Sequence, residues 1–154
     1  MTYQIFHDDS YRNSFNAMVS GLDDLNHGLI LDQTVFYPGG GGQPSDQGWL
    51  IISGNETKLR KVKKISGEIV HILPDEVSLP QVGSPLEGKL DWDHRYQLMR
   101  THTAMHVLCG TIFRDYGASV TGGNMEPLRG RMDFEISSLI IDTASQLLEC
   151  IEQS

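Results

Sequence analysis

The sequence is poor in cysteine and has no long apolar runs, and both absences limit what the chain can be. Only two cysteines, Cys109 and Cys150, occur among 154 residues, so a disulfide framework is excluded and both thiols are expected to stay reduced. No apolar stretch approaches the roughly 20 residues that a membrane-spanning helix needs. The first residues lack the basic opening and apolar run of a secretory signal. We therefore expect a cytoplasmic protein that does not cross a membrane.

Positive charge is also scarce. Twelve Lys and Arg residues stand against twenty Asp and Glu residues, and the resulting net charge of -8 argues against nonspecific adhesion to nucleic acid. Five of the twelve nevertheless fall in one short segment: Lys58, Arg60, Lys61, Lys63 and Lys64. This basic segment either meets a phosphate backbone or forms an exposed strand edge that lysine protects from pairing.

The first ninety residues have the pattern of an all-β unit. Short apolar runs are separated by glycine, proline and polar turns, which is typical of strands. The expected strands are residues 28–31, 49–52, 68–73 and 86–90. Ser66-Gly67-Glu68 has the composition of a hairpin turn. Many short strands predict a small β-barrel or sandwich in this part of the chain.

The sequence changes character at Asp91, where an acidic cap candidate precedes a segment that contains no glycine or proline as far as Cys109. A helix is expected to begin near Asp93. Gly117 is expected to end it, because glycine adopts the left-handed conformation that closes many helices. Apolar residues at helical spacing give this helix one face for a core.

The remaining residues predict a loop at 121–127, one strand at 131–136 and a second amphipathic helix from near Ser137. One strand is too little to cover the apolar face of that helix. We therefore expect a piece of a longer polypeptide, with self-association through the C-terminal helix. The expected fold class is α+β, with domains at residues 1–90 and 91–154.

Four consecutive glycines, residues 39–42, are an unusual feature. Glycine loses more conformational entropy on folding than any other residue, so a merely convenient loop would rarely use four. The bare backbone of Gly40, Gly41 and Gly42, together with Gln43, is expected to hold a polar substrate or the terminal phosphate and ribose of a nucleic acid. A turn that needs glycine only for its backbone geometry is the alternative.

His102 and His106 are the second chemical signal. Residues four apart on a helix share one face, so the two imidazoles can converge on one metal ion and supply half of a tetrahedral zinc shell. A metallopeptidase is disfavoured, because its general-base Glu would follow the first histidine and Thr103 stands there. Cys109 shares their side and either approaches the metal or is a plain core thiol. Two helix histidines satisfied by water or carbonyl groups are the alternative to a metal site.

Two motifs stand in a fixed order. Thr34-Val35-Phe36-Tyr37-Pro38 leads into Gly40-Gly41-Gly42-Gln43-Pro44-Ser45-Asp46, and Arg100-Thr101-His102-Thr103-Ala104-Met105-His106 follows about sixty residues later. Together they resemble the AlaX family of alanyl-tRNA editing proteins and the editing domain of alanyl-tRNA synthetase. The resemblance covers nearly the whole chain, since residues 122–134 also read like the segment that follows the metal helix in that family.

The resemblance implies a small N-terminal β-barrel followed by an α/β editing domain of the threonyl/alanyl-tRNA synthetase type, incomplete in this chain. It implies hydrolysis of tRNA(Ala) carrying serine or glycine, with Zn²⁺ as cofactor and His102 and His106 as metal ligands. The second ligand pair of the family, Cys-x-x-x-His nearer the C-terminus, has no counterpart in this sequence. A non-catalytic tRNA-binding or protein-binding module derived from the family is therefore the alternative function.

Thr34 and Gln43 are the residues expected to recognise the substrate hydroxyl. A hydrophobic pocket cannot strongly reject an amino acid that merely adds a hydroxyl, so an editing site must offer that hydroxyl a hydrogen-bond partner. Thr34 is otherwise an ordinary β-branched strand residue. The zinc ion either activates a water or holds the amino acid while a separate water attacks, and the sequence is consistent with both.

Overall fold

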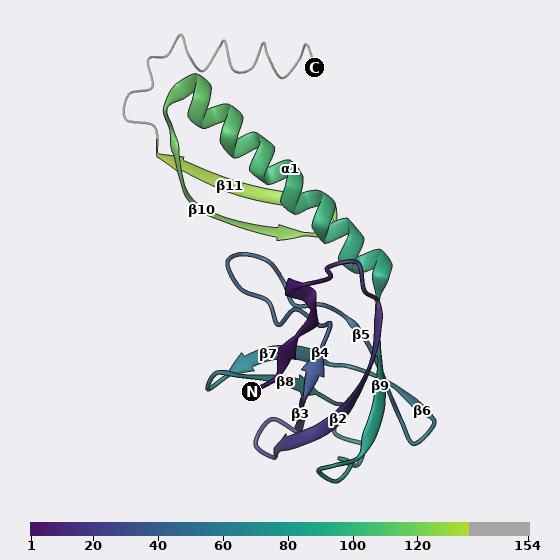
Figure 1. The fold of residues 1–154 in the computed structure, drawn as a ribbon. Helices are drawn as coiled ribbons and strands as arrows, with labels where there is room; N and C mark the ends of the chain where they lie inside the picture. The colour runs from purple at the N-terminus through teal and green to yellow at the C-terminus, as the bar shows by residue number, and fades with distance from the viewer. Residues whose placement is uncertain (136–154) are drawn as a thin grey trace.

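The computed structural model describes residues 1–135 and shows a curled antiparallel sheet that leads into one long helix (Figure 1). The expected α+β class is confirmed. In chain order the elements are β1 (Tyr3–Gln4), η1 (Ile5–His7), β2 (Ser14–Asp23), β3 (Gly28–Leu31), β4 (Gln33–Thr34), β5 (Gly48–Ile52), β6 (Asn55–Lys58), β7 (Lys61–Ile65), β8 (Glu68–Ile72), β9 (Pro85–Leu90), α1 (Trp92–Tyr116), β10 (Ser119–Glu126) and β11 (Arg129–Glu135).

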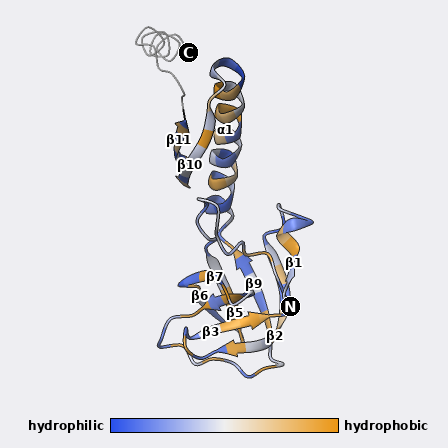
Figure 2. Cartoon of the chain, turned by 90° about the vertical axis from the view of Figure 1, so that its left-hand side faces the viewer, coloured by the Kyte–Doolittle hydropathy of each residue, from blue (hydrophilic) through white to orange (hydrophobic). Residues whose placement is uncertain are grey.

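Seven strands form the curled sheet, in the order β6-β5-β9-β2-β3-β8-β7, with every neighbouring pair antiparallel. Alternation with a period of two sets which side chains reach the core. In β2 the buried positions are Phe15, Ala17 and Val19, with polar or exposed residues between them. Figure 2 shows the complementary case, β3, an interior strand between β2 and β8 that is coloured as mostly hydrophobic.

The four expected strands correspond to β3, β5, β8 and β9 with boundary differences of one residue. The long strand β2 has no counterpart among them. Its outward positions, such as Ser14, Asn16 and Ser20, are small or polar, so its hydrophobic signal is weak although its alternation is regular. The turn at Ser66-Gly67 is confirmed by the positive φ angles of both residues, between the paired strands β7 and β8.

The helix α1 confirms the expected boundaries within one residue. Asp91 is the N-cap, and its carboxylate accepts a hydrogen bond from the backbone N–H of His94 at 3.1 Å. At the other end Gly117 adopts a left-handed conformation with φ of 64°, and its N–H donates to the carbonyl of Phe113 at 2.9 Å. Among residues 1–135, no helix has the length and hydrophobicity to cross a membrane.

The expected loop at residues 121–127 is wrong, because most of it belongs to β10, which pairs with β11 in an antiparallel hairpin along α1 (Figure 1). This half of the described chain therefore has two strands instead of one. The glycines that suggested a loop serve close packing: a Cβ on Gly123 would lie 2.7 Å from the carbonyl oxygen of Arg131 on the neighbouring strand.

Two expectations about the C-terminal part lie outside the described residues. These are the second helix from near Ser137 and the self-association through it. The division into domains at residues 1–90 and 91–154 stays a prediction. The structure does show that the chain passes directly from β9, which ends at Leu90, into α1, which begins at Trp92.

Candidate metal and substrate site

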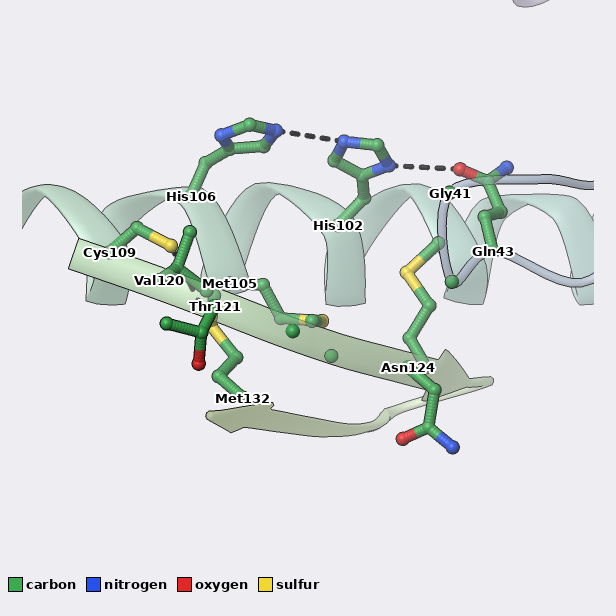
Figure 3. Close-up of a pocket in the computed structure, with 14 residues that line it drawn as sticks. Gly41, Gln43, His102, Met105, His106, Cys109, Val120, Thr121, Asn124 and Met132 are labelled. Atoms are coloured by element: carbon green, nitrogen blue, oxygen red, sulfur yellow. Dashed lines mark hydrogen bonds between the residues drawn. The ribbon is translucent and has the colours of Figure 1, made fainter. Parts of the chain in front are cut away.

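A cavity of about 380 Å³ lies where the glycine-rich loop, α1 and β10 meet (Figure 3). Segments that are far apart in the sequence therefore contribute to one site. Its lining combines polar groups with a sulfur-rich apolar wall: Gly41, Gly42, Gln43, His102, Met105, His106, Cys109, Val120, Thr121, Gly122, Gly123, Asn124, Met125 and Met132. A small, partly apolar cavity with a few convergent polar groups is typical of a ligand site.

His102 and His106 lie one turn apart on α1 with their rings side by side (Figure 3). The ring centroids are 4.8 Å apart with 19° between the planes, and the two Nε2 atoms are separated by 2.9 Å. At this distance the two nitrogens either share one proton in a hydrogen bond or face a common cation with both lone pairs. The arrangement predicted from the spacing of four is therefore present, and both rings are exposed to solvent at the cavity.

Gln43 connects the glycine-rich loop to this pair. His102 Nδ1–H donates a hydrogen bond to Gln43 Oε1 at 2.9 Å. Because a neutral imidazole carries only one proton, this contact leaves the lone pair on Nε2, the atom that faces His106. A partner of this kind on the second ring nitrogen is what orients a metal-binding histidine and fixes its tautomer.

The four glycines have two different uses. All have positive φ angles, and Gly40 and Gln43 exchange two backbone hydrogen bonds of 3.0 Å. Gly42 packs against β10: a Cβ there would lie 2.5 Å from the carbonyl oxygen of Gly123. Gly41 instead has open space around it and lines the cavity. The backbone-geometry interpretation therefore applies to Gly42, while a binding role for Gly40, Gly41 and Gly42 stays a prediction; Gly40 lies outside the lining.

Thr34 does not reach the cavity. It is fully buried in the core of the curled sheet, which is a half-barrel and not the closed barrel that the sequence predicted; its hydroxyl donates to His71 Nε2 at 2.9 Å and accepts the backbone N–H of Phe36 at 3.1 Å. His71 in turn donates from Nδ1 to the carbonyl of Leu29 at 3.1 Å. Burial lowers the pKa of His71 to about 4, so the ring is neutral at pH 7. The role of Thr34 in recognising the substrate hydroxyl stays a prediction.

Arg95 and Asp46 form a buried ion pair that the sequence did not reveal. Arg95 lies in the first turns of α1, and its guanidinium binds both carboxylate oxygens of Asp46, with 2.8 Å from Nε to Oδ1. The same guanidinium donates to the carbonyls of Val35 at 2.8 Å and Ser10 at 3.0 Å. A cation near a helix N-terminus interacts unfavourably with the helix dipole, so it needs a compensating anion. This unfavourable position of Arg95 is the one feature of the sequence that could have indicated a buried acidic partner.

The ion pair closes the base of the glycine-rich loop. Besides Arg95, Asp46 accepts the backbone N–H of Tyr37 at 2.6 Å, and its own N–H donates to the carbonyl of Tyr37 at 3.0 Å. The loop is therefore attached to α1 at two places, through Asp46 at its base and through Gln43 near its tip. A third attachment is the bond from the N–H of Met125 on β10 to the carbonyl of Gly42 at 2.9 Å.

The donor set fits part of a zinc shell. The two Nε2 atoms supply convergent nitrogen ligands, but within residues 1–135 no group of three His, Cys, Asp or Glu residues is arranged to hold a metal ion. Cys109 lines the cavity, where its thiol contacts Met132 Sδ at 3.8 Å. Two positions of a tetrahedral shell are thus accounted for by the described residues.

Comparison with known proteins agrees with the motifs. The family described as tRNA synthetases class II (A) matches residues 4–94, which is more than half of the chain. Alanyl-tRNA editing protein AlaX-M of Saccharolobus solfataricus is 37% identical over 150 residues, 96% of this chain and 61% of that protein. AlaX-M of Methanosarcina barkeri is 39% identical over 140 residues, 88% of this chain and 57% of that protein.

An alanine–tRNA ligase of Pyrobaculum neutrophilum is 41% identical over 119 residues, which are 77% of this chain but 13% of the ligase. The chain thus spans less than two thirds of the length of the AlaX-M relatives and a small part of the ligase. The chain belongs to the family of tRNA synthetases class II (A), and its resemblance to the AlaX editing proteins is confirmed.

Proposed function

We propose that the protein is a trans-editing hydrolase that deacylates tRNA(Ala) carrying serine or glycine. The names of the AlaX-M relatives support alanyl-tRNA editing in general. The observation that carries the proposal for this chain is the hydrogen bond between Gln43 and His102, since it joins the glycine-rich loop to the histidine pair at one cavity. A substrate held by the loop would then have its ester next to the two imidazoles.

His102 and His106 would hold a Zn²⁺ ion through their Nε2 atoms. When bound, zinc polarises an ester carbonyl or lowers the pKa of a coordinated water to about 7. The residues of the chain contribute the orientation: Gln43 fixes the tautomer of His102, and the helix spacing sets the distance to His106. No protein nucleophile is needed, because an aminoacyl ester is already activated and positioning supplies much of the rate.

Recognition of the amino acid would fall to the polar groups around the cavity. With its Oε1 bound to His102, Gln43 still has its amide N–H groups to offer to a serine hydroxyl. The open backbone of Gly41 allows a close approach of the terminal ribose or phosphate. Met105 and Met132 form the apolar wall against which a small side chain would pack.

The test is release of serine from Ser-tRNA(Ala), measured together with bound zinc, for the wild-type chain and for His102→Ala and His106→Ala. Each substitution should remove the metal and lower deacylation by about 100-fold or more, as expected for loss of a metal ligand or its activation. His94→Ala is the matched control, because His94 lies on the same helix but contacts Gln47 outside the cavity. Unchanged deacylation in both ligand variants would contradict the proposed metal site.

The alternative function, a binding module without catalysis, is favoured by one observation: among residues 1–135 no group of three His, Cys, Asp or Glu residues is arranged to hold a metal ion. The assay of serine release, combined with a measurement of tRNA binding, distinguishes the binding module from the hydrolase. Binding of tRNA(Ala) by the wild-type chain with no release of serine in the presence of zinc would support the binding module and overturn the hydrolase.

A further inference from the structure

The strand β11 has an open edge within the described part of the chain. It pairs with β10 on one side and with no other strand of residues 1–135. The outer edge of β10 is different near its C-terminal end, where the N–H of Met125 donates to the carbonyl of Gly42 in the glycine-rich loop. An open edge presents unpaired N–H and C=O groups that can pair with another strand.

The side chains of β11 alternate between charged and uncharged positions. Gly130, Met132 and Phe134 line a groove with α1, and Arg129 at the start of the strand lines it as well. The positions that alternate with this uncharged row are all charged and exposed: Arg129, Arg131, Asp133 and Glu135. The order of these charges is positive, positive, negative, negative.

This order is self-complementary, and we propose that β11 pairs antiparallel with β11 of a second copy of the chain, with the two-fold axis at Met132. In this register Arg129 lies opposite Glu135 of the second copy and Arg131 opposite Asp133. The axis repeats both pairs, so four cross-strand pairs of opposite charge form and no like charges are opposed. Opposite charges on directly facing residues stabilise a sheet and like charges destabilise it.

Other registers are disfavoured by the same residues. A shift by two residues in one direction places Arg131 opposite Arg131 of the second copy. In the other direction it places Asp133 opposite Asp133, so like charges face each other in both cases. After a shift by one residue, the charged side chains of one strand lie on the same face of the sheet as the apolar side chains of the other strand. Parallel pairing in register would set every charge beside an identical charge. The antiparallel register centred on Met132 is therefore the one that fits both faces.

The apolar face of the hairpin supports the same pairing. Phe134 would lie opposite Gly130 of the second copy, beside the Met105 side chain of α1, which already covers this glycine: a Cβ on Gly130 would lie 2.7 Å from Met105 Sδ. The groove beside this row has a volume of about 580 Å³ and contains Leu108 and Leu128, which are 47% and 59% exposed. Pairing of the edges would bring these apolar groups of two copies close together.

The edge strand β7 provides a contrast. It ends the large sheet and presents Lys61, Lys63 and Lys64, all exposed. Pairing of this edge with itself would bring lysines together, which is a common protection against edge association. Met132 is the one residue of β11 in the lining of the cavity, and none of the four charged residues of β11 lines it, so the charge variants described below leave the lining unchanged. Failure of the dimer and failure of the editing function are thus separate results.

The test uses two variants of the whole chain with charge of one sign along β11. The acidic variant carries Arg129→Glu and Arg131→Glu, and the basic variant carries Asp133→Lys and Glu135→Lys. Sedimentation equilibrium should show a wild-type dimer and a dissociation constant weaker by roughly tenfold or more in each variant alone, since four attractive pairs become repulsive. An equimolar mixture of the two variants should form a one-to-one heterodimer.

The matched control reverses two charges on the other edge. The variant with Lys61→Glu and Lys63→Glu should dimerise with the same dissociation constant as the wild type. Amide hydrogen exchange of the wild-type chain gives an answer that needs no variant to fold: protection of the β11 amides must rise with protein concentration. A monomeric wild-type chain, dimerisation of either one-sign variant with wild-type affinity, a mixture of folded variants that stays monomeric, or β11 protection independent of concentration would overturn the proposal.

Discussion

His71, His94 and His102 show that one residue type has three roles according to its contacts. His71 is fully buried and held neutral between Thr34 and Leu29. His94 contacts Gln47 at 3.3 Å at the start of α1. His102 contacts Gln43 and His106 at the cavity. The partners of the two ring nitrogens, which are set by the fold, decide which of these imidazoles can bind a metal.

Burial of His71 predicts a loss of stability in mild acid. Its pKa is about 4 in the folded chain against an ordinary value of 6.5, so below pH 6.5 the unfolded chain binds a proton that the folded chain excludes. The contribution is fully present above pH 6.5 and decreases as the pH falls towards 4, by about 3 kcal/mol over the whole interval. Urea unfolding of the wild type and of His71→Gln between pH 7 and pH 4 measures it.

All other titratable groups are the same in both proteins. The difference in the pH dependence of unfolding between wild type and His71→Gln therefore isolates the histidine. The free energy of unfolding of the wild type should fall more steeply than that of the variant. Parallel pH curves for the two proteins would show that His71 does not titrate as its burial requires.

Gln43 is expected to control zinc affinity through His102. Gln43→Ala removes the acceptor for Nδ1–H and should weaken zinc binding by about 10-fold to 100-fold, the usual range for loss of such a partner. Gln47→Ala is the matched control, because Gln47 also contacts a histidine of α1 through its side-chain amide, donating from Nε2 to His94 Nε2 at 3.3 Å, but outside the cavity. Zinc titration with a competing chelator measures both. Equal affinities for the two variants would remove Gln43 from the site.

Gly41 and Gly42 should respond differently to alanine. Both have positive φ, which costs an alanine roughly 1–2 kcal/mol, but only at Gly42 would the new Cβ collide with a backbone atom, Gly123 O, at 2.5 Å. Gly42→Ala should therefore destabilise the protein by about 1–3 kcal/mol more than Gly41→Ala, the cost of overpacking. Thermal unfolding compares them, and similar losses in both variants would argue against tight packing of the loop on β10.

At the scale of elements, α1 sets the distances across the site. Arg95, His102 and His106 are seven and four residues apart, so they follow one side of the helix over about three turns. Arg95 binds the base of the glycine-rich loop, and His102 binds it near the tip. The helix therefore fixes the loop at two points and presents the histidine pair beside it.

Loss of the Arg95 guanidinium should destabilise the whole arrangement. Arg95→Met leaves Asp46 buried without its cation, and breaking a buried pair in this way costs about 3–5 kcal/mol. Arg114→Met is the matched control, because Arg114 forms an exposed pair with Asp115 and such pairs contribute about 0–1 kcal/mol. Chemical unfolding measures both variants. If Arg95→Met lowered the free energy of unfolding as little as Arg114→Met does, water would have to solvate Asp46 in place of the guanidinium.

On the scale of the whole molecule, the net charge of -8 opposes the approach of a nucleic acid, while the basic segment at residues 58–64 attracts it. Lys61, Lys63 and Lys64 are exposed on β7, and Arg60 is paired with Asp75 at 2.8 Å. The strand lies at the end of the large sheet, so both interpretations of the segment, phosphate contact and edge protection, fit its position.

Charge reversal distinguishes these interpretations if tRNA is the partner. Lys61→Glu with Lys63→Glu should weaken tRNA binding by about tenfold or more and lower the dependence of affinity on salt, because fewer phosphates are neutralised and fewer counterions are released on binding. Filter binding at several salt concentrations measures both quantities. Arg114→Glu, on the far end of α1, is the control. Unchanged affinity and salt dependence would leave edge protection as the role of these lysines.

Local patterns predicted much of the fold. Four strands, the turn at Ser66-Gly67 and both ends of α1 follow from alternation, turn composition and capping, which act over a few residues. The hairpin β10–β11 was not predicted, because Gly122 and Gly123 have the composition of a loop and become a strand only through contact with β11 and α1. Tertiary packing overrides local propensity at such positions.

The sequence by itself determined the family, the spacing of His102 and His106 on one helix face, and the presence of a glycine run, since motifs and helical periodicity are local properties. Only the tertiary structure decided that Gln43 reaches His102, that Thr34 is enclosed in the core of the curled sheet, and that Arg95 neutralises Asp46. These contacts join residues 37 to 59 positions apart. Chain segments so distant in sequence meet only when burial of apolar surface folds the curled sheet and brings the glycine-rich loop into contact with the helix.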